Sequence, residues 1–288
     1  MGATNQRTTV STRSLHDTQA ILQHYAAGYF PLYDWAGRFY WERLPVRAII
    51  PLNDHVAGSA RRMAARSRRK FSMRYNERLD DCIRILQNER VKPMTWVRTH
   101  VARIYRILNH GGFLHTVEAY NARGRLVGGL VAILLPGVVI AETMFSLEPD
   151  ASKVCLCDLV ERFHAAGFDM IDVQTPHDLD PEGTPRIAPG KTPHPCVRLG
   201  EEVLDLPAFM HRFTSVMSDR FDGAPEALAS HARRIKVAHE AYTAGHEFEV
   251  ALLATALQAD PLLHQAWRVL QHNTSQAFIE AFNRTHAG

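Results

Sequence analysis

The sequence lacks a hydrophobic segment long enough to cross a bilayer. Its first residues form no apolar, signal-like region, and the longest apolar run, residues 130–141, is interrupted by Pro136 and Gly137. A transmembrane helix needs about 20 consecutive apolar residues, so this run is too short. We therefore expect a soluble, cytoplasmic protein.

Cysteine is scarce, and its spacing fits no familiar metal site. Cys155 and Cys157 stand two residues apart, which suits neither a zinc knuckle nor an easy disulfide, so we expect reduced thiols. The 16 histidines are scattered. His177 and His194, in a proline-rich stretch, lack a third ligand at metal spacing. The sequence therefore predicts no metal site.

Several catalytic motifs are also absent. The chain has no Gly-x-Ser-x-Gly nucleophile motif, no Walker-type phosphate loop and no Gly-x-Gly-x-x-Gly after a strand. These absences argue against the common hydrolase, NTPase and dinucleotide-binding classes. The net charge of +3 is too small to indicate a nucleic-acid partner by itself, so the position of the charges matters more.

What is present is an ordinary globular composition, with 46% hydrophobic residues in a chain of 288. This length favours one large domain, or a main domain with an appendage. Apolar periodicity predicts helices near 17–27, 59–69, 79–88, 97–109 and 150–166, and strands near 38–41, 114–121, 126–134, 138–144 and 169–174. Residues 175–195 read as a long loop, and another helix begins near 207. The order predicts an α+β fold with a mixed sheet.

From Pro225 onward the composition shifts to Ala, His and other helix formers. The stretch 242–261 is similar to one helical hairpin of the tetratricopeptide kind, but one copy does not make a solenoid. We expect a helical extension, 221–288, that could dock a partner.

One predicted helix is strongly basic. It carries Arg61, Arg62, Arg66, Arg68, Arg69 and Lys70, with no acidic residue between them. Arg62, Arg66 and Arg69 fall on one face. A solvated helix usually mixes charge signs, so phosphate binding and a merely solvated face both remain open.

Polar residues are embedded in two apolar strands. Glu142 lies in Val-Ile-Ala-Glu-Thr-Met-Phe, and Asp172 and Gln174 lie in Met-Ile-Asp-Val-Gln. Burying a carboxylate costs several kcal/mol unless it is paired or used. Asp172 and Gln174 share a strand face because they stand two apart. A buried salt bridge or a polar catalytic site would each explain the pattern.

Several blocks resemble the leucyl/phenylalanyl-tRNA–protein transferase family, in the order that the family uses. They are Tyr25–Pro31 (Tyr-x-x-Gly-x-Phe-Pro), the spacing of Trp41 and Arg47, Thr95-Trp96, His115–Glu118, Leu126–Gly129, Glu142–Ser146 through Ala151–Lys153, and Ile171–Gln174.

The resemblance implies a fold and a reaction. The fold would be GNAT-like (acyl-CoA N-acyltransferase-like), with a small N-terminal domain at 1–75, a catalytic domain at 76–220 and the extension. The reaction would move leucine, phenylalanine or methionine from aminoacyl-tRNA to the N-terminal amine of an acceptor protein, tagging it for degradation. No cofactor is needed, because the ester is already activated.

The resemblance also implies roles for individual residues. Asp172 would polarise Gln174, whose carbonyl oxygen would accept a hydrogen bond from the attacking amine, while Glu142 would recognise the aminoacyl amine or the adenosine. The basic helix would hold the phosphates of the tRNA acceptor stem. The remaining substrate-binding residues would be an apolar pocket of Leu130, Met144, Phe163 and Ile171, its neighbours Phe145 and Ser146, and Trp41 and Trp96 against the terminal adenosine.

The sequence departs from the family pattern after Gln174. The family's His-Leu-x-Ser-Leu-Gly block is missing there, and a degraded version stands at His194–Gly200 after an insertion. The acceptor's N-terminal Lys or Arg would need an acidic recess, for which Asp178, Asp180 and Glu182 are candidates.

Two other functions remain open. The segment Arg125–Leu130 is faintly similar to the pyrophosphate loop of CoA-dependent N-acyltransferases, although Leu130 stands where a small residue belongs. A non-catalytic tRNA-binding adaptor, docking through its tail, is the other alternative.

Overall fold

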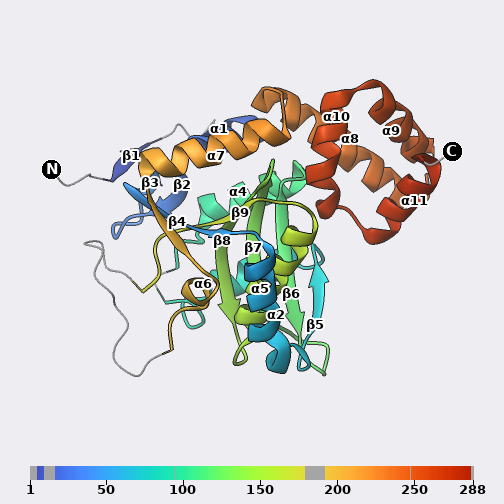
Figure 1. The fold of residues 1–288 in the computed structure, drawn as a ribbon. Coiled ribbons are helices and arrows are strands. Elements are labelled where there is room, and N and C mark those ends of the chain that lie inside the picture. Colours follow the sequence, from blue (N-terminus) through green and yellow to red (C-terminus); the bar gives the residue numbers. More distant parts are fainter. Residues whose placement is uncertain (1–4, 10–16, 94, 179–191, 247, 287–288) are drawn as a thin grey trace.

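The computed structural model describes residues 5–9, 17–93, 95–178, 192–246 and 248–286. Within them lie two sheets, flanking helices and a helical C-terminal part (Figure 1). The α+β class with a mixed sheet, a small N-terminal sheet and C-terminal helices is confirmed. No helix in the described ranges combines the length and apolarity needed to cross a membrane.

The larger sheet has seven strands in the order β10-β4-β9-β8-β7-β6-β5. Their bounds are β4 Val46–Pro51, β5 Ser72–Tyr75, β6 Leu114–Tyr120, β7 Leu126–Leu135, β8 Val138–Ser146, β9 Met170–Gln174 and β10 Glu202–Asp205. All neighbours are antiparallel except β8 and β9, which are parallel and are connected through helix α5 (Ala151–Ala165). Parallel strands need such a crossover connection.

The smaller sheet has three antiparallel strands in the order β1-β3-β2. They are β1 Gln6–Thr8, β2 Phe30–Tyr33 and β3 Phe39–Arg43, and helix α1 (Thr18–Ala26) precedes β2. β4 and β5 also come from the first 75 residues, yet both are strands of the large sheet. The N-terminal segment is therefore shared between the two sheets.

Helices cover both faces of the large sheet. A side chain at Gly128 would meet Ala151 of α5, and one at its neighbour Gly129 would meet Cys82 of α3 (Leu79–Leu86). Adjacent strand residues point to opposite faces, so α5 and α3 lie on opposite sides of the sheet. α2 (Asp54–Arg68) packs on α5, α4 (Thr99–His110) contacts β6, and α7 (Leu206–Arg220) contacts β4, β8 and β10.

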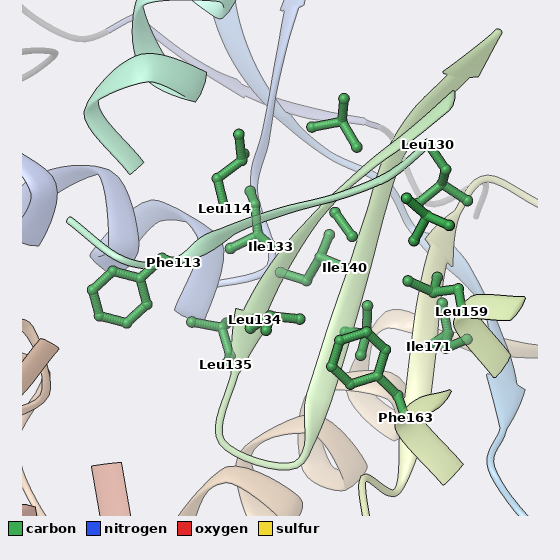
Figure 2. Close-up of a cluster of buried hydrophobic side chains, with 14 of the residues drawn as sticks. Phe113, Leu114, Leu130, Ile133, Leu134, Leu135, Ile140, Leu159, Phe163 and Ile171 are labelled. Atoms are coloured by element: carbon green, nitrogen blue, oxygen red, sulfur yellow. The ribbon is translucent and has the colours of Figure 1, made fainter. Parts of the chain in front are cut away.

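The core is continuous on the α5 face (Figure 2). Leu130 and Leu134 of β7 pack there with Leu159 and Phe163 of α5 and Ile171 of β9, whereas Ile133 and Ile140 lie on the opposite face of the sheet. β7 and β8 are buried along nearly their whole length, which explains why their sequence is continuously apolar rather than alternating.

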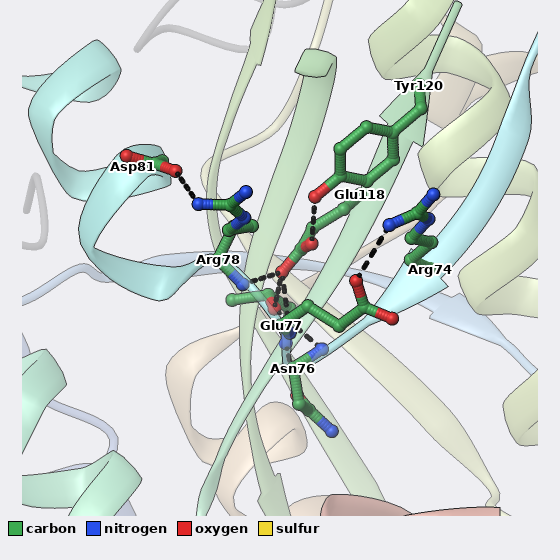
Figure 3. A network of polar contacts seen from close by, with 8 residues as sticks. Arg74, Asn76, Glu77, Arg78, Asp81, Glu118 and Tyr120 are labelled. Atoms are coloured by element: carbon green, nitrogen blue, oxygen red, sulfur yellow. Dashed lines mark hydrogen bonds and ion pairs between the residues drawn. The ribbon is translucent and has the colours of Figure 1, made fainter. Parts of the chain in front are cut away.

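A buried carboxylate joins β6 to the start of α3 (Figure 3). The side chain of Glu118 is fully buried and accepts hydrogen bonds from the backbone N–H groups of Glu77 (3.1 Å) and Arg78 (2.8 Å). The hydroxyls of Thr116 and Tyr120 donate to it as well, at 2.7 and 2.9 Å. Arg78 caps α3 without a side-chain hydrogen bond, and Glu118 adds negative charge at this helix N-terminus to that of Asp80 and Asp81 in the first turn.

The C-terminal part consists of helices that dock on the sheet and on α1. They are α8 Pro225–Thr243, α9 Phe248–Ala259, α10 Pro261–Leu270, η2 Gln271–Asn273 and α11 Gln276–His286. Asn273 holds this part to the sheet: its Oδ1 lies 3.0 Å from Nδ1 of His115, and its Nδ2 donates to the carbonyl of Gly112 at 2.5 Å. The expected C-terminal helices are confirmed.

The sequence misplaced one helix start and missed five strands. α2 begins at Asp54 rather than at Ser59, because Asn53 caps it by accepting from the N–H of Val56 at 2.9 Å. The helix passes through Gly58, a residue that usually lowers helix propensity. β1, β2, β4, β5 and β10 were not expected.

Two glycines, Gly128 in β7 and Gly58 in α2, give opposite expectations for substitution by alanine. A Cβ at Gly128 would lie 2.6 Å from the Cβ and 2.9 Å from the backbone of Ala151, whereas one at Gly58 would meet only the flexible end of Arg62 at 3.3 Å. We expect Gly128→Ala to destabilise the protein by about 1–3 kcal/mol. Gly58→Ala should be neutral or stabilise it by up to about 1 kcal/mol through helix propensity. Urea unfolding measures both, and equal effects would contradict the close approach of α5 to β7.

Candidate active site

A β-bulge in β8 orients the side chain of Glu142 toward Tyr105 and Gln174. In the β7–β8 register, Val131 pairs with Thr143 and Ala132 pairs with Ala141, so Glu142 is the extra residue. A bulge re-aims side chains and bends its strand. The side chain of Glu142 is buried and accepts a hydrogen bond from the hydroxyl of Tyr105 on α4, at 3.1 Å. The carboxylate therefore lies on the face of the large sheet that α4 covers.

β8 and β9 part close to this bulge. They pair only from Val138–Ile140 to Met170–Asp172; beyond this, β9 continues with β4 and β8 continues with β7. The amide Nε2 of Gln174 donates to Oε1 of Glu142 at 2.7 Å, so a side-chain hydrogen bond spans the opening. Both side chains are buried. The opening between two parallel strands is thus lined by a carboxylate and an amide.

Asp172 lies beneath Gln174 in a buried ion pair with Arg47 of β4. The side chains are 0% and 2% exposed, and the guanidinium also donates to the carbonyl of Gly28 at 3.2 Å. The rings of Phe30 and Phe209 flank it, each 4.9 Å from the guanidinium carbon. Asp172 is therefore fully compensated, as a buried charge must be.

The other oxygen of Asp172 sets the backbone of Gln174. Oδ1 accepts from the Gln174 backbone N–H at 2.8 Å, and Gln174 has a φ of 65°, in the left-handed region. A non-glycine residue there costs about 1–2 kcal/mol, and such strain is found where the surroundings fix it. Asp172 thus contacts the main chain of Gln174 and not its amide, which corrects the expected side-chain polarisation. Glu142 contacts that amide instead.

Burial dominates the electrostatics of Glu142. Desolvation raises the pKa of this carboxyl from 4.5 to about 7, against the hydrogen bond from Tyr105, which lowers it. The hydroxyl of Tyr25 faces the same carboxylate, and burial and that charge raise the pKa of Tyr25 well above its usual value. Perturbed carboxyls of this kind cluster at functional sites.

The structure separates the two tryptophans. Trp41 is fully buried, stacked on His24 with ring centroids 4.6 Å apart. Trp96 is half-buried, and Nζ of Lys92 lies 4.2 Å from the centre of its ring. Lys92 also donates to the hydroxyl of Thr143, beside Glu142. Of the two rings, only Trp96 offers partly exposed surface near the carboxylate's strand.

The expected apolar pocket is mostly core in this structure. Leu130, Phe163 and Ile171 are fully buried on the α5 face (Figure 2). Met144, which pairs with Leu130, is half-buried. Because Ile171 adjoins Asp172 on β9, the two side chains point to opposite faces of the sheet. The structure therefore places this set behind the polar residues rather than around them.

Phe145 packs against β7, and Ser146 contacts the first turn of α5. Phe145 is buried on the α3 face, where a Cβ at Gly129 would lie 2.5 Å from its ring. Ser146 is exposed, and its hydroxyl accepts from the N–H of Ser152 in the first turn of α5, at 3.3 Å.

The basic helix α2 divides into paired and unpaired cations. Arg61 and Arg68 form ion pairs with Glu161 of α5, and Arg68 lies 4.0 Å from Asp158. The acidic partners that the local sequence lacks are thus supplied by another helix. Arg62, Arg66, Arg69 and Lys70 are exposed, and none has an ion pair within the described part of the chain.

The candidate acidic recess is only partly visible. Asp180 and Glu182 lie outside the described residues. Oδ2 of Asp178 accepts from the backbone N–H of His194 at 2.6 Å, and it thereby joins the two ends of the insertion.

Sequence reasoning missed Tyr105 and Lys92. Tyr105 lies among the apolar residues of α4, with Val101, Ile104 and Leu108, and a hydroxyl in an apolar stripe was the available signal. Lys92 follows α3 in a segment without periodicity, so no signal pointed to it.

Comparison with known proteins identifies the family. Residues 49–181 match the model of the leucyl/phenylalanyl-tRNA protein transferase family. The leucyl/phenylalanyl-tRNA–protein transferase of Herpetosiphon aurantiacus is 39% identical over 163 residues, which are 55% of this chain and 82% of that protein. Those of Rubrobacter xylanophilus and Gloeobacter violaceus are each 35% identical, over 55% and 54% of this chain and 82% and 79% of theirs.

Among solved structures, that of L-PGS from Bacillus licheniformis is 12% identical, with a TM-score of 0.36 over 69% of this chain and 70% of that one, too distant to support an argument. The sequence relatives decide the family, because more than two thirds of each is covered at 35% identity or more. The chain belongs to the leucyl/phenylalanyl-tRNA–protein transferase family.

Proposed function

We propose that this protein transfers leucine, phenylalanine or methionine from aminoacyl-tRNA to the N-terminal α-amine of an acceptor protein beginning with Lys or Arg, marking it for degradation. The observation that carries the proposal is the hydrogen-bonded pair of Glu142 and Gln174 at the opening between β8 and β9. The names of the relatives supply the reaction class.

Gln174 is suited to orient the attacking amine. Its Nε2 donates to Glu142, which leaves the carbonyl oxygen to accept from the amine's N–H. The nitrogen lone pair would then attack the ester carbonyl, forming the C–N bond and breaking the bond to the ribose oxygen. That oxygen leaves with the proton that the amine gives up. Glutamine is a poor base, so positioning contributes more to the rate than proton transfer does.

Glu142 and Asp172 support Gln174 in different ways. Glu142 polarises the amide and fixes its orientation, while Asp172 holds the main chain in its left-handed conformation. Asp172 is thus a positioning residue.

The opening between β8 and β9 offers the aminoacyl side chain a route to the other face of the sheet. With the ester at Gln174, a leucyl or phenylalanyl side chain could pass between the strands toward Met144, Leu130 and Ile171. Because Met144 is half-buried, its side chain would move first to make room. In an apolar pocket there, each methylene missing from the aminoacyl side chain would weaken its binding by about 0.8 kcal/mol.

The tRNA would be held by surface groups. Trp96 supplies the ring surface for the terminal adenosine, in place of the buried Trp41, and Arg62, Arg66 and Arg69 supply phosphate contacts without reading sequence. We also propose that the sheet is of the GNAT-like type. Its support is a mixed sheet with a single parallel pair that opens at the site.

The CoA-dependent alternative loses its main support. Residues 126–135 form strand β7 and not a loop at a helix N-terminus, so their backbone N–H groups are not arranged to cradle a pyrophosphate.

Replacing Gln174 tests the proposed activity. With radiolabelled leucyl-tRNA and a peptide beginning with arginine, we expect the wild type to label the peptide. Gln174→Ala should slow single-turnover transfer about 100-fold, because the amine loses its orientation. Gln87→Ala, at an exposed glutamine at the end of α3, is the matched control and should be fully active. No labelling by the wild type would refute the proposed function.

Replacing Asp172 should affect folding as well as activity. Asp172→Ala leaves Arg47 as an unpaired buried charge, which costs about 3–5 kcal/mol of stability in urea unfolding. The double variant Arg47→Met/Asp172→Leu should recover most of that stability but not the transfer activity. If Asp172→Ala unfolds at the same urea concentration as the wild type, the ion pair does not have this role.

The raised pKa of Glu142 predicts opposite effects on stability and activity. Folding favours the protonated form, so this stabilisation is complete below pH 4.5 and is lost as the pH rises through about 7. A shift of this size corresponds to about 3 kcal/mol. Glu142→Gln should therefore be more stable than the wild type at pH 8 but not at pH 4.5. Transfer by the wild type should rise through about pH 7, as the carboxylate forms.

In the Glu142→Gln variant, that inflection should disappear and transfer should be slow at every pH. A variant with the wild-type pH profile would show that Glu142 does not titrate in the reaction.

A further inference from the structure

Three potential metal ligands meet beside the proline-rich insertion. His177, His194 and Cys196 each offer one ligand atom, and these atoms lie within 4.8 Å of one another. The two imidazole rings stack with centroids 3.9 Å apart and planes inclined by 8°. Cys196 is 1% exposed and the histidines are half-buried. The fold therefore supplies the third ligand that the sequence spacing did not reveal.

The surrounding contacts orient the first histidine for metal binding. Nδ1 of His177 lies 2.7 Å from Oε2 of Glu201, whose side chain is 2% exposed, and the His177 backbone N–H donates to the other oxygen at 2.8 Å. A carboxylate that holds Nδ1–H leaves the Nε2 lone pair free, as in carboxylate–histidine–zinc arrangements. With Nδ1 protonated, the ring is thus oriented to offer Nε2 to a metal.

The second histidine lies on the far side of the insertion but is held equally close. Its backbone N–H donates to Asp178 at 2.6 Å, and its Nδ1 accepts from the N–H of Cys196 at 3.3 Å. That last bond is long for N–H···N or N–H···O geometry. A metal bound through this nitrogen would replace only a weak contact.

We propose that His177, His194 and Cys196 bind a zinc ion. Two imidazoles and a thiolate suit zinc, with bonds of about 2.0–2.1 Å to nitrogen and 2.3 Å to sulfur. Tetrahedral ligands at those distances lie roughly 3.3–3.8 Å apart, so closing the site needs shifts of about 1 Å. A metal lies in the plane of each imidazole that binds it, so the His194 ring must also turn out of its stack on His177. Zinc binding would release the thiol proton of Cys196. Water or the second oxygen of Asp178 completes the tetrahedron.

The position of the site suggests what the metal does. His177 follows Gln174 by three residues, and Cys196 lies in the short helix α6 (Pro195–Arg198), next to Glu201 and the edge strand β10. The ion would join the chain just after Gln174 to the edge of the sheet. Its role is therefore structural, and zinc binding does not depend on the proposed transfer activity.

The test is metal binding by the full-length protein. After removal of metal with a chelator and addition of zinc, we expect elemental analysis to find about one zinc ion per chain. Cobalt substitution should give a thiolate-to-cobalt charge-transfer band. Cys196→Ser should abolish that band, and His177→Gln should lose stoichiometric zinc. Glu201→Gln should weaken zinc binding about 10–100-fold, because it removes only the orienting carboxylate.

Cys82→Ala and His211→Gln, at a cysteine and an exposed histidine outside the cluster, are matched controls that should bind zinc like the wild type. Circular dichroism of each variant establishes that it is folded. A wild-type protein that takes up neither zinc nor cobalt, or a folded Cys196→Ser or His177→Gln variant with unchanged affinity, would overturn the proposal. Activity assays are separate, so failure of transfer would not affect this result.

Discussion

The site depends on a buried ion pair between Arg47 and Asp172. Arg47 and Asp172 come from neighbouring strands of the large sheet, and their ion pair is closed off by the carbonyl of Gly28 and two aromatic rings. Such a pair is weak evidence for stability, because removing charges from water is costly. Here the pair fixes the geometry of the site. One oxygen of Asp172 accepts from the Arg47 guanidinium, and the other accepts from the backbone N–H of Gln174. The small N-terminal sheet and α7 pack around the pair and are thereby tied to the site.

The second buried carboxylate of the site, Glu142, lies in a different environment. Its bulge places the carboxylate in a buried position, where the hydroxyl of Tyr105 and the amide of Gln174 lie within hydrogen-bond distance but no cation among the described residues does. The consequence is a pKa near 7 and a loss of stability at neutral pH. Proteins keep such costs where function requires them. Asp172 is therefore paired with a cation and positions the main chain of Gln174, whereas Glu142 has a raised pKa and orients the Gln174 amide.

The sequence predicted the parts of the fold that are periodic. Helices and the central strands, whose apolar spacing is clear, lie within a few residues of their expected bounds. β1, β2, β5 and β10 were missed because each has only three or four residues, and β4 was missed because it contains Arg47, whose burial depends on a partner 125 residues away. No local pattern contains that information.

The candidate site shows the same division. Glu142, Asp172 and Gln174 were found because polar residues in apolar strands are unusual, and the structure brings them together. The roles within the trio were not predictable, since they depend on a bulge and on one residue's left-handed backbone. Trp41 and the Arg61 and Arg68 pairs show the limit of motif transfer: their environments come from tertiary contacts. The third ligand beside His177 and His194 was hidden for the same reason.

The central claim is that Glu142 and Gln174 act as one unit, and a double-mutant cycle of single-turnover transfer tests it most directly. Residues that act as a unit show strongly non-additive effects. The account predicts that Glu142→Gln combined with Gln174→Ala is hardly slower than Gln174→Ala alone. If the two losses multiply, the residues contribute independently and the proposed arrangement is wrong.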